Sequence, residues 1–257
     1  MTTLEEIIEH KKHRLVRAQE ALPLEELERS AAPVKNRGFK AAISKGGKVN
    51  LIAEIKKASP SHGVIRHNFN AIDIAKIYKK SGAAALSVLT EDKYFQGSIE
   101  DLKAVRQAVD IPILRKDFII SEYQIFESAA AGADAVLLIA AALDKGMIKA
   151  LFNEAKSLGM DILIEVHNER ELDKALASGA QIIGINNRDL ATLEVDLDTT
   201  VRLMPKVPPE KTVVSESGIR EPEDIARLAR SGVKAVLIGT AFMEADDIGS
   251  EVRRVMG

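Results

Sequence analysis

A short phrase recurs along this chain and constrains its fold more than any other feature of the sequence. Each copy is a helical segment, a small residue, a glycine and then a run of apolar residues. Glycine just past a helix can adopt the left-handed conformation that ends it, so each copy predicts a helix stop followed by a buried parallel strand. The copies are Ser81-Gly82 before ALSVL, Ala131-Gly132 before AVLLI, Ser178-Gly179 before IIGI and Ser231-Gly232 before AVLIG, with a looser one at Leu158-Gly159 before ILIE.

The spacing of these copies fits a strand-helix unit of about 25 residues, and filling the gaps gives eight strand candidates. Eight parallel strands are the number that closes a TIM (β/α)8 barrel, a fold of about 250 residues. The alternative, an open doubly wound sheet, would carry a glycine-rich loop after an early strand if it bound a nucleotide, and the sequence has none. We therefore predict an α/β barrel with strands at 50–56, 84–89, 112–116, 134–139, 161–166, 181–186, 212–216 and 235–239, and with helices at segments such as 71–81, 121–131 and 221–231.

Residues 1–45 precede the first strand and are predicted to form an N-terminal helical extension on a barrel of residues 46–257. Their polar helices, at 4–21, 24–29 and 39–44, are too short to bury a core of their own. In the last of these helices Phe39, Ala42 and Ile43 make a small apolar face that must pack against something. The amino-terminal end of the barrel is one candidate surface, and its carboxyl-terminal mouth is the other.

Composition excludes several classes of function. The 257 residues include 36 Lys and Arg against 38 Asp and Glu, so the formal charge is only -2, and we expect no nucleic-acid partner. The absence of Cys rules out disulfides, thiolate metal sites and cysteine nucleophiles, which suits a cytoplasmic location. The charged N-terminus does not resemble a signal peptide, and no apolar stretch is long enough to span a membrane. We expect a soluble, unprocessed protein.

Charged and polar side chains stand at the carboxyl ends of the predicted strands, where barrel enzymes place their chemistry. In LIAEIK, Glu54 and Lys56 share the inward face with Ile52, because alternate residues of a barrel strand point into the lumen. Any one such residue could be a solvated loop charge or part of an ion pair, but their recurrence at the same end of different strands favours an active site. The others are Lys116, Glu165, Asn186, Arg188 and Glu216.

The loops after the last two strands predict a phosphate-binding site. Ser217 and Gly218 follow the seventh strand, Gly239 and Thr240 follow the eighth, and these loops often bind phosphate in this fold. Glycine lets backbone amides approach an anion closely. Phe95 and Phe118 lie beyond the second and third strands and could wall an apolar slot.

The five histidines show no metal-ligand spacing, so we expect structural positions for all of them. His167 lies just past Glu165 and could face the mouth of the barrel, but we expect a surface position for it.

Several motifs together resemble the indole-3-glycerol-phosphate synthase family, and the resemblance covers essentially the whole chain. The longest and most specific is IAEIKKASPSHGVI at 52–65, which contains Ser59. The later motifs follow in the family's order, and PLEEL at 23–27 matches within the extension. They are LRKDFI at 114–119, LIEVHN at 163–168, GINNRDL at 184–190, SESGI at 215–219 and IGTAFM at 238–243.

The resemblance implies conversion of 1-(2-carboxyphenylamino)-1-deoxyribulose 5-phosphate to indole-3-glycerol phosphate, carbon dioxide and water in tryptophan biosynthesis, with no cofactor or metal. It implies that Lys116 is the general acid and Glu165 the general base, and that Ser59 belongs to the substrate-binding residues. Thr240 stands where the family pattern leads us to expect Ser, which keeps the hydroxyl.

The resemblance also favours the mouth of the barrel as the place of the extension, where an apolar cover would exclude water. On that basis, deletion of residues 1–45 is expected to leave a folded barrel with poorer kinetics. The alternative is an extension that only stabilises the fold.

Alternative functions are a sibling phosphate-binding barrel enzyme, such as phosphoribosylanthranilate isomerase or the tryptophan synthase α subunit, and an inactive barrel that serves as a partner subunit. The first would not carry EIKKASPS on its first strand, and the second would have lost Lys116 or Glu165. We expect a small phosphorylated substrate, no membrane partner, and a monomer or a weak homo-oligomer.

Overall fold

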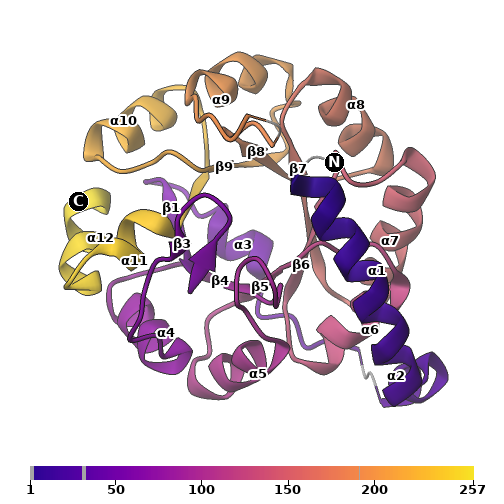
Figure 1. Ribbon diagram of the computed structural model, residues 1–257. Helices are drawn as coiled ribbons and strands as arrows, with labels where there is room; N and C mark the ends of the chain where they lie inside the picture. Colours follow the sequence, from indigo (N-terminus) through magenta and orange to yellow (C-terminus); the bar gives the residue numbers. More distant parts are fainter. Residues whose placement is uncertain (1–2, 31–32, 191) are drawn as a thin grey trace.

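The chain forms a closed barrel of parallel strands inside a ring of helices, as a computed structural model shows (Figure 1). The structure describes residues 3–30, 33–190 and 192–257. Within those ranges, eight strands close in the order β1-β10-β9-β8-β7-β6-β5-β4. Each lies inside its predicted range, so the TIM barrel is confirmed. The strands are β1 Asn50–Ile55, β4 Ala85–Leu89, β5 Ile113–Lys116, β6 Ala135–Ile139, β7 Asp161–Val166, β8 Ile182–Asn186, β9 Thr212–Glu216 and β10 Ala235–Ile238.

The connecting helices end as the recurring phrase predicts. Gly82, Gly132, Gly159, Gly179 and Gly232 all have positive φ, the left-handed conformation that stops a helix. The helices outside the barrel are α4 Ala71–Lys80, α5 Ile99–Ala108, α6 Glu122–Ala130, α7 Lys145–Ser157, α8 Glu169–Ser178, α9 Asp198–Leu203 with the 3-10 turn Met204–Lys206, α10 Pro222–Arg230, α11 Thr240–Glu244 and α12 Ile248–Met256.

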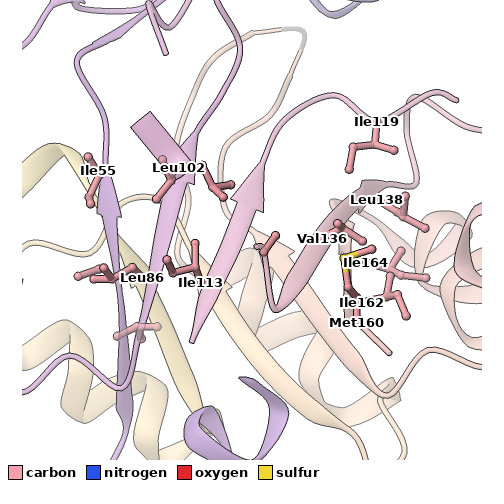
Figure 2. Packing of buried hydrophobic residues seen from close by; sticks show 14 of the residues in the cluster. Ile55, Leu86, Leu102, Ile113, Ile119, Val136, Leu138, Met160, Ile162 and Ile164 are labelled. Carbon is pink, nitrogen blue, oxygen red and sulfur yellow. The ribbon is translucent and has the colours of Figure 1, made fainter. Parts of the chain in front are cut away.

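Alternate residues of each strand face opposite sides of the barrel wall, which separates the buried apolar side chains into an inner and an outer cluster. Ile52 and Leu114 belong to the inner cluster, which fills the barrel. Ala53 and Ile55 belong to the outer cluster, which packs the strands against the helices, and part of which is drawn in Figure 2. The inward and outward faces predicted for the first strand are therefore confirmed.

The helix α3, Phe39–Ile43, closes the amino-terminal floor of the barrel. Phe39 and Ile43 are fully buried in the inner cluster, and the amide of Lys40 donates to the carboxylate of Asp161, 3.0 Å away, at the start of β7. The expectation that this helix covers the carboxyl-terminal mouth is wrong. The two large apolar side chains of this helix extend the inner cluster at that end of the barrel.

The helix α1, Thr3–Ala21, lies at the other end of the barrel, where Figure 1 shows it in indigo over one side, running from near β7 toward α6. The side chain of Lys11 is fully buried, and its Nζ lies 2.6 Å from Oδ1 of Asp117, the residue that follows β5. The adjoining helix α2, Leu24–Ser30, packs against α6. The extension therefore contacts the barrel at both ends.

The division of the chain at residue 45 stays a prediction, and residues 1, 2, 31 and 32 of the extension lie outside the described part of the chain. A feature that the sequence did not predict is a two-stranded antiparallel hairpin after β1, formed by β2 Ala58–Ser59 and β3 Gly63–Val64. The amide of Ala58 donates to the carbonyl of Phe95, which ties this hairpin to the loop after β4. No helix in the described ranges has the length and apolar character needed to cross a membrane.

The buried ion pair between α1 and β5 predicts a large effect of one substitution. Lys11→Ala would leave the buried Asp117 carboxylate with one cation, Arg115 at 3.0 Å, in place of two, and we expect the unfolding free energy to fall by about 2 kcal/mol. The matched control is Lys12→Ala, because Lys12 is its exposed neighbour on the same helix, and its loss should change stability by less than about 0.5 kcal/mol. Urea unfolding of both variants checks this, and equal midpoints would contradict the assigned importance of the pair.

Candidate active site

The ammonium group of Lys116 lies at the centre of an ionic layer across the top of the barrel. Its Nζ is 3.4 Å from Oε2 of Glu216, 3.5 Å from Oε2 of Glu165 and 3.9 Å from Oε1 of Glu54. Lys56 joins this layer, because its Nζ lies 2.8 Å from Oε2 of Glu54. Every one of these residues comes from the carboxyl end of a strand or the residue just after it, so the predicted convergence is confirmed as geometry.

The three contacts of Lys116 are at ion-pair distances, longer than a close charge-assisted hydrogen bond. Burial alone would lower the pKa of this amine, but the surrounding carboxylates outweigh burial and raise it above its ordinary value. The ammonium is therefore charged at neutral pH. Because it is not locked to a single carboxylate, its protons are available to a ligand that enters the layer.

The carboxyl groups of this layer differ in pKa although they share one cation. Burial favours the neutral form of each, and for Glu216 burial and the nearby carboxylates prevail over Lys116, which raises the pKa to about 8. For Glu165 burial is outweighed by Lys116, His167 and Asn186, so the pKa falls below its ordinary value. At neutral pH a neutral Glu216 and an ionised Glu165 consequently face the same cation, Lys116. Two carboxyl groups whose pKa values differ in this way can act as a proton donor and a proton acceptor, respectively.

Above this layer lies a cavity of about 530 Å³. Its polar floor is the ionic layer, and its walls include the rings of Phe95 and Phe118, whose centroids are 6.1 Å apart. Leu4 and Ile7 of α1 line it from above. The extension thus supplies apolar wall to the mouth through its first helix, and not through the helix that the sequence pointed to.

The remaining predicted residues also line this cavity. The buried Ser59 comes from the hairpin after β1, and its Oγ is 3.4 Å from Oγ of Ser61. Asn186 ends β8, and its side-chain oxygen accepts from the amide of Arg188. The Arg188 guanidinium donates to the carbonyl of Leu193, and burial lowers its pKa.

The two predicted phosphate loops meet on one side of the cavity, which Ser217, Gly218, Gly239 and Thr240 all line. Ser217 and Gly218 have positive φ, and a Cβ on Gly218 would also strike Val195. At Gly239 φ is negative, and a Cβ would strike the carboxylate of Glu54. That glycine therefore makes room for the ionic layer as well as for a ligand.

Several residues that shape the site were not predicted. Asn187 donates to the side chain of Ser215 and to the carbonyls of Glu216 and Ser217, which fixes the start of one phosphate loop. The expected surface position of His167 is wrong, because its side chain is only 10% exposed. The ring is held beside Glu165 by Glu171, four residues further along the chain. The sequence pattern alone did not indicate this contact.

A group of possible metal ligands lies beside α1 and outside the ionic layer. Ligand atoms of His10, Glu91 and Asp92 lie within 4.8 Å of one another. The carboxylate of Glu91 already accepts from the amides of Lys93, Tyr94 and Phe95, so its oxygens serve the loop. This group positions the loop that carries Phe95.

Comparison with known proteins identifies the family. The family model described as indole-3-glycerol phosphate synthase matches residues 4–255. The chain belongs to the indole-3-glycerol phosphate synthase family. Indole-3-glycerol phosphate synthases from Caldanaerobacter subterraneus subsp. tengcongensis and from Polaromonas naphthalenivorans are each 49% identical to it. The alignment with the first covers 99% of this chain and 99% of the relative, and that with the second covers 99% and 98%.

Solved structures that resemble this chain show the fold alone. A 3-hexulose-6-phosphate synthase superposes with a TM-score of 0.66 at 16% identity, covering 81% of this chain and 98% of its own. A thiamine phosphate pyrophosphorylase from Pyrococcus furiosus superposes with a TM-score of 0.61 at 18% identity, covering 80% and 93%. Family membership over nearly the whole chain decides against the sibling barrel enzymes considered from the sequence.

Gly184 in β8 packs against the ionic layer so closely that a larger residue there should disturb it. A Cβ at Gly184 would strike Oε1 of Glu216 and the side chain of Leu163. We expect Gly184→Ala to move the Glu216 carboxyl away from Lys116 and to lower kcat by about 100-fold, the cost of a misplacement near 1 Å. Gly249→Ala is the control, because Gly249 lies in α12, where a Cβ meets only ordinary contacts. Steady-state kinetics would contradict the expectation if both variants kept wild-type kcat.

Proposed function

We propose that this cavity closes and decarboxylates 1-(2-carboxyphenylamino)-1-deoxyribulose 5-phosphate, giving indole-3-glycerol phosphate, carbon dioxide and water. The observation that carries the assignment is the ammonium of Lys116 among the carboxylates of Glu54, Glu165 and Glu216 at the base of an apolar-walled cavity. The family match over residues 4–255 supports the same reaction. The substrate has an aryl ring, a ketone and a phosphate, and the site offers an apolar wall, an acid and phosphate-type loops for them.

In the ring-closing step an aromatic carbon attacks the ketone, and negative charge develops on its oxygen. Lys116 stabilises and protonates that alkoxide, because it is a charged acid held at the centre of the layer. The carboxyl group then leaves the attacking carbon as carbon dioxide, and the electron pair of the broken carbon–carbon bond restores the aromaticity of the benzene ring. Water must be excluded from this step, and the apolar side chains of Leu4, Ile7, Phe95 and Phe118 close the cavity above it.

In the dehydration step a hydroxyl leaves as water while a ring proton is removed. Glu165 accepts the proton, and Lys56, fixed by Glu54, assists the leaving hydroxyl. The low pKa of Glu165 in the free enzyme depends on the Lys116 charge. When Lys116 has given up its proton, that charge is gone and the pKa of Glu165 rises, so the base gains strength at the step that uses it. Glu216, with a raised pKa, donates a hydrogen bond to a substrate oxygen from its neutral form.

The other predicted residues bind the substrate. Ser217, Gly218, Gly239 and Thr240 surround the phosphate, and Arg188 contributes positive charge to the same cavity. Asn186 acts beside the base, because its side chain hydrogen-bonds Glu165 and favours the ionised carboxylate, and Ser59 binds substrate from the hairpin after β1. We place the enzyme in the cytoplasm as a monomer or a weak homo-oligomer, with neither nucleic acid nor membrane as a partner.

Removal of the acid is the first test of this function. Lys116→Met removes the charge and shortens the side chain by a single atom, and we expect kcat to fall at least about 100-fold, since acid catalysis contributes that much or more. Binding of product should change little, because the charge matters most as the alkoxide forms. Indole fluorescence after addition of the carboxyphenylamino sugar phosphate measures turnover.

The control for this variant is Lys103→Met, since Lys103 is a half-exposed lysine on α5 paired with Glu100. A Lys116→Met enzyme that kept more than about a tenth of wild-type kcat would remove this lysine from the acid role. A wild-type protein that formed no indole product would remove the proposed function itself.

A second test concerns the phosphate loops. Gly218→Ala forces a side chain into a left-handed position and against Val195, so the loop must shift. We expect affinity for inorganic phosphate and for product to fall about ten-fold, which corresponds to 1.4 kcal/mol. Gly82→Ala imposes comparable backbone strain far from the site, with open space around the new side chain. Calorimetric titration showing equal phosphate affinity for the two variants would place the phosphate elsewhere.

A further inference from the structure

The imidazole ring of His167 lies between two carboxylates at the edge of the ionic layer. Its Nε2 is 3.4 Å from Oε1 of Glu165, and its Nδ1 is 2.8 Å from Oε2 of Glu171. Glu165 is the last residue but one of β7, and Glu171 lies in the first turn of α8. The ring therefore joins the strand that carries the proposed base to the helix that follows it.

Glu171 is itself held firmly. Its Oε2 accepts from the backbone amide of His167 at 2.9 Å, and its Oε1 accepts from Nδ2 of Asn168 at 2.6 Å. Asn168 is the N-cap of α8 and accepts from the amide of Glu171 in return. Because this reciprocal cap fixes the carboxylate, the Nδ1 side of the ring has a rigid partner and its orientation is set.

The two carboxylate oxygens of Glu165 have different partners. Oε1 faces the imidazole, whereas Oε2 faces Nζ of Lys116 in the cavity. Both side chains are almost wholly shielded from solvent, at 3% exposure for Glu165 and 10% for His167. A carboxylate held on one oxygen presents the other in a defined direction, which is the requirement for a base that must reach one proton.

The charge on the ring follows from its neighbours. Burial lowers the pKa of His167, but hydrogen bonding and attraction to Glu165 and Glu171 outweigh it and raise the pKa to about 10. The imidazolium in turn helps to keep Glu165 ionised. The charged groups facing this pair are Glu171 from α8, Lys116 from β5, Glu216 from β9 and Glu54 from β1.

We propose that His167, held by Glu171, is a positioning residue for the reaction, which fixes Glu165 with Oε2 aimed into the cavity and keeps that carboxylate ionised. The inference rests on the proposed function, because it assigns His167 to the base of that reaction. In this arrangement Glu171 of α8 orients the imidazole ring of His167, and the ring orients Glu165, the proposed base. A merely structural role would instead confine His167 to joining β7 and α8.

The sign of the expected pH effect follows from the lowered pKa of Glu165. Activity that needs the ionised carboxylate is present above that pKa and is lost as the pH falls through it. Removing the imidazolium removes a cause of the lowering, so the pKa of Glu165 rises and the acid limb of the pH profile moves to higher pH. A variant that only loosens the fold would lower the melting temperature without moving this limb.

The test compares His167→Gln and Glu171→Gln with wild type in kcat, KM and the pH profile of kcat/KM. For His167→Gln we expect kcat to fall roughly ten-fold with KM nearly unchanged, and the acid limb to move up by about one pH unit. Glu171→Gln should shift the acid limb in the same direction but by a smaller amount. In this variant the imidazole of His167 remains, and a neutral amide replaces its carboxylate partner. His13→Gln, at an exposed histidine of α1, is the matched control and should behave as wild type.

Glu165→Gln, measured in parallel, separates the two assignments. If Glu165→Gln is inactive while His167→Gln keeps the wild-type limb and kcat, the positioning role is overturned and the proposed function stands. If Glu165→Gln retains wild-type kcat, the proposed base is wrong and the inference falls with it. Circular dichroism and melting temperature establish that each variant is folded, and a lowered melting temperature with an unmoved limb also overturns the positioning role.

Discussion

Closure of the parallel strands into a barrel is the constraint on which the other features depend, because it sends every second side chain into one shared interior. Solvent cannot reach the lower part of that interior, so Ile52, Leu114 and their neighbours must be apolar, and α3 must fill the space beneath them. At the carboxyl ends the same alternation points Glu54, Lys116 and Glu165 at one another. The alternation of side chains in a closed barrel therefore produces both the core and the site. Inward side chains are apolar in the lower part of the barrel and charged at the carboxyl ends of the strands.

In the ionic layer three carboxyl groups share the ammonium of Lys116, and Lys56 adds a close pair with Glu54. An isolated buried carboxylate would be costly, but Lys116 serves Glu54, Glu165 and Glu216 together, and the raised pKa of Glu216 reduces the negative charge that must be compensated. Such a layer combines a charged ammonium, an ionised carboxylate and a neutral carboxyl group within a few ångströms. Because no carboxylate holds the ammonium at close range, a substrate oxygen can take its place among them.

The sequence was sufficient to predict whatever followed from periodicity along one strand or helix. The strands, their inward faces and the gathering of Glu54, Lys116 and Glu216 at one end are all properties of local pattern combined with barrel closure. Contacts between distant segments were not predictable in this way. His167 faces inward because Glu171 holds its ring, Lys11 is buried because it meets Asp117, and α3 enters the floor because the strands leave a space there. In each case the deciding partner lies on another element.

The seam of the barrel joins β1 to β10, and the wall of the cavity includes Ile7 from the first helix and Thr240 after the last strand. During synthesis, α1 leaves the ribosome long before Asp117 exists to receive Lys11, and β1 waits still longer for its second neighbour. Contacts so distant along the chain form late and slow the overall folding. A nascent chain that lacks its last strand consequently has neither a closed barrel wall nor the side of the cavity that Gly239 and Thr240 line.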